Sequence, residues 1–233
     1  MRRLLAASVF CLVSHVAVAD VLVSEFTLGN PFSNGSVSAS ITYAPAGGEG
    51  RSLSANAGQF SIKVDSAISP LLVFCVDIFH NLSLPSNYTQ TALTTLTSAR
   101  LSQLNALLSH ASDVVLDANT SGGMLLAVWE VLYEDVLTGL NVNAGEFKTT
   151  SAANATANLY LSYLAGTWTA DKNGTLTGSV QHLVPVSPSH SQELAFYEGT
   201  GSSTVSVPEP ASMALLGMGL VGLGLTRRRT IRG

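Results

Sequence analysis

Residues 122–134 read GGMLLAVWEVLYE, and this stretch decides the fold class of the chain. Behind Gly122-Gly123, the apolar side chains recur with a helical period and cover two adjacent stripes of a helix: Met124, Val128 and Val131, and Leu125, Trp129 and Leu132. The spacing therefore predicts a largely buried helix that starts after the two glycines. Its polar residues, Glu130 and Glu134, lie one turn apart, which is typical of a narrow solvated stripe.

Two further helices and several strands are predicted around this central helix. Apolar residues recur at helical spacing from Ser98, a suitable N-cap, to about residue 110, and again from about Ser151 until Gly166. Alternating or continuous apolar runs predict strands at residues 37–43, 60–64 and 71–79 before the helices, and at 182–186 and 193–197 after them. Pro185 marks 182–186 as an edge strand. Strands, then three helices, then strands predict a single α+β domain.

The composition excludes one class of function. Of the 233 residues, 46% are hydrophobic and 11% are charged, which is enough apolar sequence for a packed core. Six of the eleven basic residues lie in two terminal clusters, so residues 20–206 hold five basic against fourteen acidic residues, a net charge of −9. Nucleic-acid binding needs clustered cations at the phosphates, so we predict no nucleic-acid partner.

The N-terminal residues have the pattern of a secretory signal peptide. A cationic start, Arg2-Arg3, precedes an apolar run and the small-residue triplet from Ala17 to Ala19. This order predicts a signal peptide over residues 1–19 that is cleaved before Asp20. The alternative is a buried N-terminal strand or helix.

The C-terminal end has three ordered features. They are a short rigid motif formed by Val207, Pro208, Glu209 and Pro210, a glycine-rich apolar run over residues 211–225, and a basic stop formed by Arg227, Arg228 and Arg229. A run of about 15 residues is near the lower limit for a membrane-spanning helix, and the arginines are expected on its cytoplasmic side. We therefore predict one C-terminal hydrophobic helix that is transiently anchored in the inner membrane. The alternative is a permanent tail anchor.

These three features resemble the PEP-CTERM sorting signal of Gram-negative bacteria that produce exopolysaccharide. The resemblance implies export across the inner membrane, recognition by an exosortase, which is a membrane-embedded cysteine transpeptidase, and release or anchoring of the body at the cell surface. Signal peptidase and exosortase are then the expected processing partners. The chain is expected to divide into a signal peptide (1–19), an extracytoplasmic α+β domain (20–198), a linker rich in Gly, Ser and Thr (199–206) and the sorting segment (207–233).

Cys75 is the one cysteine left after removal of the signal peptide, because Cys11 leaves with that peptide. It lies in the segment Phe74-Cys75-Val76-Asp77, and the segment from Leu125 to Glu130 follows fifty residues later. This pair of segments resembles the thioester domain of bacterial surface adhesins. The resemblance implies a cysteine that condenses with a glutamine to form an internal thioester, which then acylates surface nucleophiles. At the position of that glutamine this chain has Leu125, which carries no amide.

Two interpretations of Cys75 therefore stay open. One is a reactive thiol, or a thioester formed with another glutamine such as Gln103. The other is an unpaired cysteine that packs in a strand as a small hydrophobic side chain, and the absence of an amide at residue 125 favours it. An exposed single thiol would pair only with a second chain.

No catalytic, cofactor or metal site is predicted. Glu130, Glu134 and Asp135 are close in sequence, but the paired carboxylates of glycosidases come from separate elements that flank a cleft. The histidines lack metal-ligand spacing, and the chain contains no Gly-x-Ser-x-Gly nucleophile motif.

The sequence as a whole predicts an exported, non-enzymatic protein of the cell surface or of an exopolysaccharide-rich, biofilm-like matrix. Its expected partner outside the cell is a polysaccharide or a surface protein. Two alternatives stay open: a covalent thioester adhesin that uses Cys75, and a secreted hydrolase that uses Glu130 or another carboxylate.

Overall fold

The structure is a computed structural model that describes residues 20–27, 29–65, 69–93, 96–135, 139–168, 179–186 and 191–199. Along the chain its elements are β1 (Asp20–Phe26), β2 (Val37–Tyr43), β3 (Arg51–Ala57), β4 (Phe60–Val64), β5 (Leu71–Cys75), β6 (Ser86–Ala92), α1 (Ser98–Val114), α2 (Ala118–Tyr133), β7 (Phe147–Ser151), α3 (Asn154–Leu164), β8 (Ser179–Pro185) and β9 (Leu194–Glu198).

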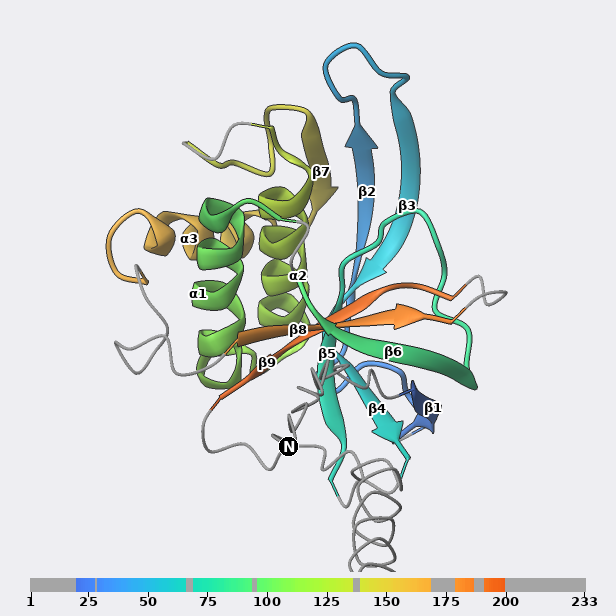
Figure 1. Cartoon of the computed structure of the whole chain (residues 1–233). Helices are drawn as coiled ribbons and strands as arrows, with labels where there is room; N and C mark the ends of the chain where they lie inside the picture. The colour runs from blue at the N-terminus through green and yellow to red at the C-terminus, as the bar shows by residue number, and fades with distance from the viewer. Residues whose placement is uncertain are drawn as a thin grey trace, which may run out of the picture. The chain divides into compact units, whose positions relative to one another are not determined.

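The strands form two separate sheets. Six of them close into an antiparallel barrel in the order β1-β4-β5-β9-β8-β6, and the other three form a small sheet in the order β3-β2-β7 (Figure 1). Only Gly58 and Gln59 separate β3 from β4, so the chain passes directly from the small sheet into the barrel.

The three helices pack together beside these sheets, and α2 is the central one (Figure 1). It contacts α1, α3 and all three strands of the small sheet, whereas α1 also packs against β8 and β9 of the barrel. Every residue of α2 from Ser121 to Val131 is buried. The sequence-based prediction of a largely buried helix is therefore confirmed.

The start of α2 differs from the prediction. The helix begins at Ala118, because the Asp117 side chain accepts a hydrogen bond from the Thr120 amide (2.8 Å) and the Thr120 hydroxyl completes a capping box. Gly122 and Gly123 lie inside the helix rather than before it. A Cβ atom on Gly122 would lie 2.3 Å from Cγ2 of Val37, so this glycine allows the helix to approach β2.

The predicted mixture of helices and strands is confirmed, but the structure contains more strands than were predicted, and their order differs. The structure adds four strands, β1, β3, β6 and β7, and β7 separates α2 from α3, so the helices are not consecutive. The predicted strand 71–79 ends at Cys75. The prediction that Pro185 marks an edge strand is wrong, because β8 lies between β6 and β9 and Pro185 is its last residue, paired with Tyr88.

Several predicted segments lie outside the described residues. They are the signal peptide, the linker beyond Gly199 and the C-terminal hydrophobic helix. Among the helices that the structure does describe, none has the length and apolarity needed to cross a membrane.

Candidate functional site

Cys75 is the last residue of β5, and its thiol is buried. The residue is 1% exposed, and its Sγ atom donates a hydrogen bond to the Asp77 carbonyl oxygen at 2.9 Å. Burial raises the pKa of the Cys75 thiol well above its ordinary value, because the interior solvates a thiolate poorly. The free thiol is thus held in its protonated form.

The two segments that resemble a thioester domain lie side by side in the structure. Trp129 of α2 donates from Nε1 to the carbonyl oxygen of Cys75 at 3.0 Å. One turn further along α2, the Tyr133 hydroxyl donates to the Val76 carbonyl (3.0 Å) and accepts from the Ile78 amide (3.2 Å). Leu125 is fully buried. The central helix therefore fixes the backbone that follows β5.

A glutamine that the sequence did not single out also lies next to the thiol. The side-chain amide of Gln192 donates to the Asp77 carbonyl oxygen at 2.7 Å, so Gln192 Nε2 and Cys75 Sγ share one acceptor. The segment before β9 is anchored by Ser191, whose hydroxyl lies 2.8 Å from the Tyr88 hydroxyl and donates to the Ser83 carbonyl at 2.9 Å. Gln192 lies more than a hundred residues from Asp77, and no local pattern could have indicated this contact.

Glu130 and Glu134 are buried, which corrects their predicted place on a solvated stripe. They anchor the loop that leads from α2 to β7: Glu130 Oε1 accepts from the Asn141 amide (2.7 Å) and Glu134 Oε2 accepts from the Glu146 amide (2.8 Å). Gly145, with φ +100°, leaves room for the Glu134 carboxylate, which a Cβ atom there would strike at 2.1 Å. Burial raises the pKa of Glu130 to about 7. Each carboxylate therefore holds the loop through one oxygen, and Glu130 Oε2 is buried without a hydrogen-bond partner among the described residues.

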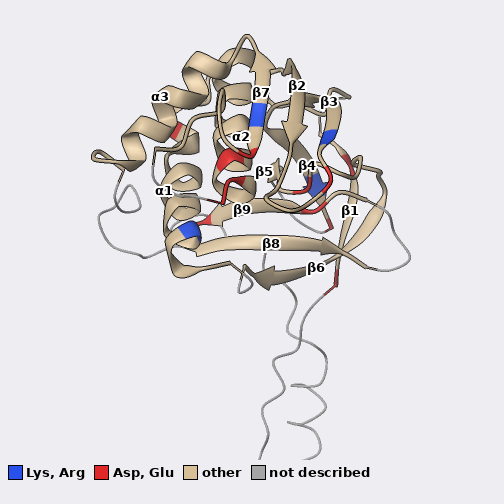
Figure 2. Ribbon diagram, turned by 90° about the horizontal axis from the view of Figure 1, so that it is seen from above, with Lys and Arg blue, Asp and Glu red and all other residues tan. Residues whose placement is uncertain are grey.

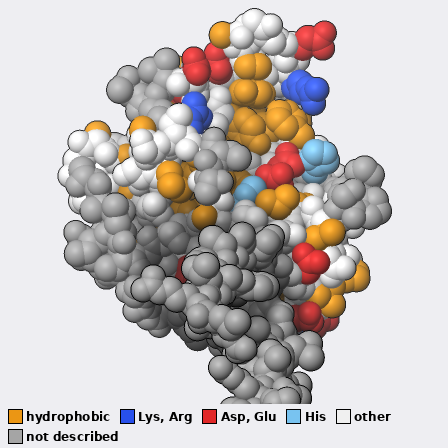
Figure 3. All heavy atoms as spheres, viewed as in Figure 1, with side chains coloured by type: hydrophobic (Ala, Val, Ile, Leu, Met, Phe, Trp, Pro, Cys, Tyr) orange, Lys and Arg blue, Asp and Glu red, His pale blue; other side chains and the backbone are white. Residues whose placement is uncertain are grey.

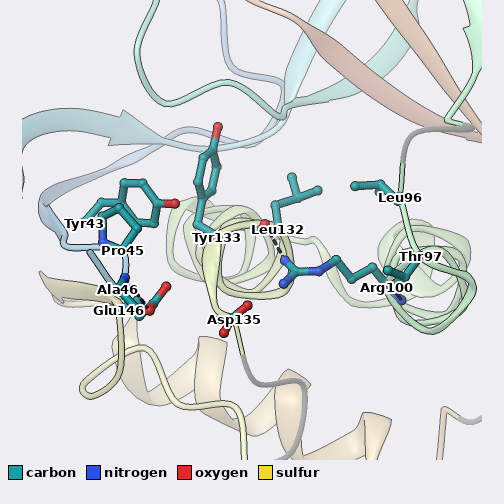
Figure 4. A pocket seen from close by; sticks show the side chains of 10 residues that line it. All are labelled: Tyr43, Pro45, Ala46, Leu96, Thr97, Arg100, Leu132, Tyr133, Asp135 and Glu146. Carbon is teal, nitrogen blue, oxygen red and sulfur yellow. Dashed lines mark hydrogen bonds between the residues drawn. The ribbon is translucent and has the colours of Figure 1, made fainter. Parts of the chain in front are cut away.

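An open pocket of about 430 Å³ lies at the C-terminal end of α2 (Figure 4). Its lining comes from the end of β2 and the loop after it, the start of α1, the end of α2 and the residue before β7: Tyr43, Pro45, Ala46, Leu96, Thr97, Arg100, Leu132, Tyr133, Asp135 and Glu146. Segments far apart in the sequence thus meet around this cavity.

Aromatic rings form one side of the pocket. Tyr43 and Tyr133 meet edge to face, with ring centroids 5.3 Å apart and planes at 72°. Phe79 touches both tyrosines, at 6.0 Å from Tyr43 and 5.9 Å from Tyr133, and is 40% exposed. The Arg51 guanidinium lies 5.1 Å from the centre of the Phe79 ring. Tyr43, Phe79 and Tyr133 are called the aromatic cluster below.

Three charged side chains also line the pocket (Figure 4). The Arg100 guanidinium donates to the carbonyl oxygens of Val131 (2.9 Å), Leu132 (2.5 Å) and Glu134 (2.5 Å), so it caps the C-terminal end of α2. Asp135 and Glu146 place two carboxylates at the same cavity, and Glu146 Oε1 accepts from the Ala46 amide at 2.7 Å.

The three histidines among the described residues contact a single carboxylate or an aromatic ring. His80 contacts Asp77, and His182 lies 2.9 Å from Glu193 and lowers the pKa of that carboxyl through the hydrogen bond. His110 stacks on Trp168 at 4.5 Å. Within the described part of the chain, no three His, Cys, Asp or Glu side chains gather as metal ligands would.

The predicted processing residues lie mostly outside the described residues. This holds for Ala17 and Ala19, for the motif from Val207 to Pro210, and for Arg227, Arg228 and Arg229. Asp20, the residue after the predicted cleavage point, is the first residue of β1.

Comparison with known proteins supports the C-terminal prediction. Residues 206–229 match the PEP-CTERM protein-sorting motif. The chain therefore carries the sorting signal of exosortase substrates, which implies export, processing by an exosortase and a location at the cell surface or outside the cell. No curated protein and no solved structure is significantly similar to the chain.

Proposed function

We propose that this protein is a non-catalytic binding module that holds extracellular polysaccharide at the cell surface or in the matrix. The observation that carries the proposal is the pocket at the end of α2. It combines a fixed aromatic wall with a few charged groups, the usual composition of a small-molecule binding site. Its volume of about 430 Å³ lies within the range of about 300–1,000 Å³ found for such sites.

The arrangement of the charged groups favours binding over turnover. Arg100 is engaged by three carbonyl oxygens, and Glu146 is engaged by the Ala46 amide, so both support the cavity wall. Glu130, the carboxylate of the hydrolase alternative, does not line the pocket, and its Oε1 atom holds the Asn141 amide. Arg100, Glu146 and Glu130 thus support the fold around the pocket.

The test starts from the processed protein recovered from the surface or medium of producing cells. Intact mass is expected to show a chain that begins at Asp20 and ends near Pro208. This protein should co-sediment with the exopolysaccharide of the same cells and release no new reducing ends from it. A protein that stays in the supernatant at all polymer concentrations would refute the binding function. Release of reducing ends that Glu146→Gln abolishes would establish the hydrolase instead.

A covalent adhesin is a second candidate function, and one observation favours it. The Cys75 thiol and the Gln192 amide donate to the same oxygen, so both lie within hydrogen-bonding reach of one atom. In the reaction the Cys75 sulfur would attack the side-chain amide carbon of Gln192, the S–C bond would form, the C–N bond would break, and ammonia would leave. The raised pKa of Cys75 opposes this step, because the thiolate is the nucleophile.

Intact mass separates the two candidates. A thioester would lower the mass of the recovered protein by one ammonia, and methylamine would add to it covalently. Gln192→Ala would abolish both effects, whereas Gln103→Ala, the matched control at the glutamine named from the sequence, would not. A full mass, inertness to methylamine and a single alkylation only after unfolding would leave Cys75 as a packed side chain.

A further inference from the structure

We infer that the pocket at the end of α2 binds one ring of an uncharged, hydroxyl-rich carbohydrate and discriminates against acidic sugars. This inference rests on the proposed function and names the class of polymer. It combines three properties of the pocket: the aromatic cluster, the two carboxylates, and a cation that is already engaged.

The aromatic wall is suited to the apolar face of a sugar ring. The face of an aromatic ring is electron-rich, and it attracts the positively polarised C–H groups of a pyranose. The Tyr133 ring is held in place because its hydroxyl binds the Val76 carbonyl and the Ile78 amide. Tyr43 meets it at 72°, so the two rings form a fixed corner (Figure 4). A fixed corner loses little side-chain entropy when a ligand binds.

The carboxylates supply acceptors for sugar hydroxyls. An ionised carboxylate accepts at about four positions, so Glu146 keeps acceptor capacity after its bond with the Ala46 amide. Asp135 lines the cavity from the end of α2 (Figure 4). Hydroxyl groups that donate to a carboxylate form charge-assisted hydrogen bonds, which are stronger than neutral ones.

The charged residues that line the pocket disfavour a sugar ring that carries a carboxylate. Among the described residues that line the pocket, Arg100 is the one positively charged residue, and three backbone carbonyls already engage its guanidinium. A uronate in the pocket would face two carboxylates without a free cation. Among the described residues the basic side chains are few and separated from one another (Figure 2). Arg51 lies beside the aromatic cluster, 5.1 Å from the Phe79 ring, and not in the pocket lining, so the discrimination concerns the ring inside the pocket.

The surface next to the pocket accommodates a second ring. Phe79 extends the aromatic cluster out of the cavity and is 40% exposed. In Figure 3 hydrophobic side chains gather on this face of the molecule, with acidic and basic side chains bordering them. The ligand is therefore a chain of sugars rather than a single one, and affinity is expected to rise from a monosaccharide to an oligosaccharide.

The experiment titrates the recovered, processed protein with two sets of oligosaccharides of equal length. One set contains neutral oligomers of glucose, galactose or mannose, and the other contains uronic-acid oligomers. We expect at least one neutral oligomer to bind and every uronic-acid oligomer to bind more weakly. Titration calorimetry provides the affinities.

Four variants test the named residues. Tyr43→Ala should weaken neutral binding about tenfold, whereas Tyr43→Phe, which keeps the ring, should stay within about twofold. Asp135→Asn should weaken neutral binding and improve uronate binding, a reversal that a general loss of structure would not produce. Asp65→Asn, an exposed carboxylate that does not line the pocket, is the matched control and should change neither affinity.

The outcomes separate this inference from the proposed function. If the protein does not co-sediment with any matrix polymer, the proposed function fails. If it does, but Tyr43→Ala and Asp135→Asn leave the affinities unchanged, or uronic-acid oligomers bind better than neutral ones, the inference alone is overturned. The same holds if no neutral oligomer binds while the native polymer still does.

Discussion

The neighbourhood of Cys75 and the pocket are built on the same helix, one turn apart, and differ in access. Trp129 binds the carbonyl of Cys75 in the interior and is 2% exposed. Four residues later, Tyr133 binds the next carbonyl of that strand end and presents its ring to an open cavity. A single turn of α2 thus leads from a sealed thiol to an accessible binding surface.

This difference shows that burial decides which side chains can contact solutes. Cysteine is the most nucleophilic residue type in the body, and the 1% exposure and raised pKa of Cys75 oppose reaction of its thiol with solutes. The described residues that line the pocket include no cysteine, but the rings and carboxylates among them reach solvent. Substitutions in the two regions should therefore affect different quantities: stability in the interior and affinity at the surface.

The largest expected effect is that of Trp129→Ala. It removes a buried indole together with its hydrogen bond to Cys75, which should lower the free energy of unfolding by about 3–5 kcal/mol. Denaturant unfolding measures the change. Leu159→Ala on α3, which truncates a side chain 48% exposed, is the control and should cost far less. Equal losses in the two variants would show that α2 does not organise the interior.

The second effect concerns pH and Glu130. Burial raises its pKa from 4.5 to about 7, so between these pH values the folded protein retains a proton that the unfolded chain has lost. The contribution of Glu130 to stability is therefore greatest below about pH 4.5 and falls until about pH 7, by roughly 3 kcal/mol. Glu130→Gln should remove this decline, whereas Glu25→Gln at an exposed site should preserve it. Parallel pH profiles for the wild type and Glu130→Gln would contradict the assignment.

A smaller loss of stability is expected for Arg100→Met. The guanidinium donates to three carbonyls at the end of α2, and loss of such charge-assisted bonds should cost about 1.5–3 kcal/mol. Thermal or denaturant unfolding provides the value. Arg100→Lys keeps the charge without the planar fork and should restore part of it. If Arg100→Met unfolds like the wild type, the guanidinium is available to ligands, and the expected preference for neutral sugars loses its basis.

The smallest effect is expected for Phe79→Ala. Because this ring lies at the edge of the aromatic cluster and is 40% exposed, its loss should reduce oligosaccharide affinity by less than about 1 kcal/mol and leave monosaccharide affinity unchanged. Titration with sugars of increasing length detects the difference. An equal loss of affinity at every sugar length would show that Phe79 contacts the ring bound in the pocket.

The sequence predicted the elements that have a clear apolar period. The buried helix α2 and the alternating strands β2 and β4 were predicted from the spacing of their apolar residues. Tertiary contacts do not change these elements. Strand β3, with the sequence RSLSANA, and β7, with FKTTS, were missed. Most of their side chains are small or polar, and pairing with β2 rather than intrinsic preference makes them strands.

The candidate site was less predictable than the fold, because its residues meet only through tertiary contacts. Tyr43 and Glu146 are separated by about a hundred residues, and the ring and carboxylate converge only when β2 and β7 pair. Glu130 and Glu134 were assigned to solvent because a charged stripe on a helix usually faces water. Backbone amides of the following loop bind one oxygen of each carboxylate instead, and no periodic pattern signals such a loop.

The closed barrel has a consequence for how densely this protein can accumulate outside the cell. A closed barrel offers no unpaired strand that could recruit a second copy and start aggregation. In the part of the chain that the structure describes, the small sheet leaves two open edges, β3 and β7, and each carries a basic residue, Arg51 and Lys148. Like charges would meet if two identical edges paired in parallel and in register. The fold is therefore suited to crowding without fibre formation.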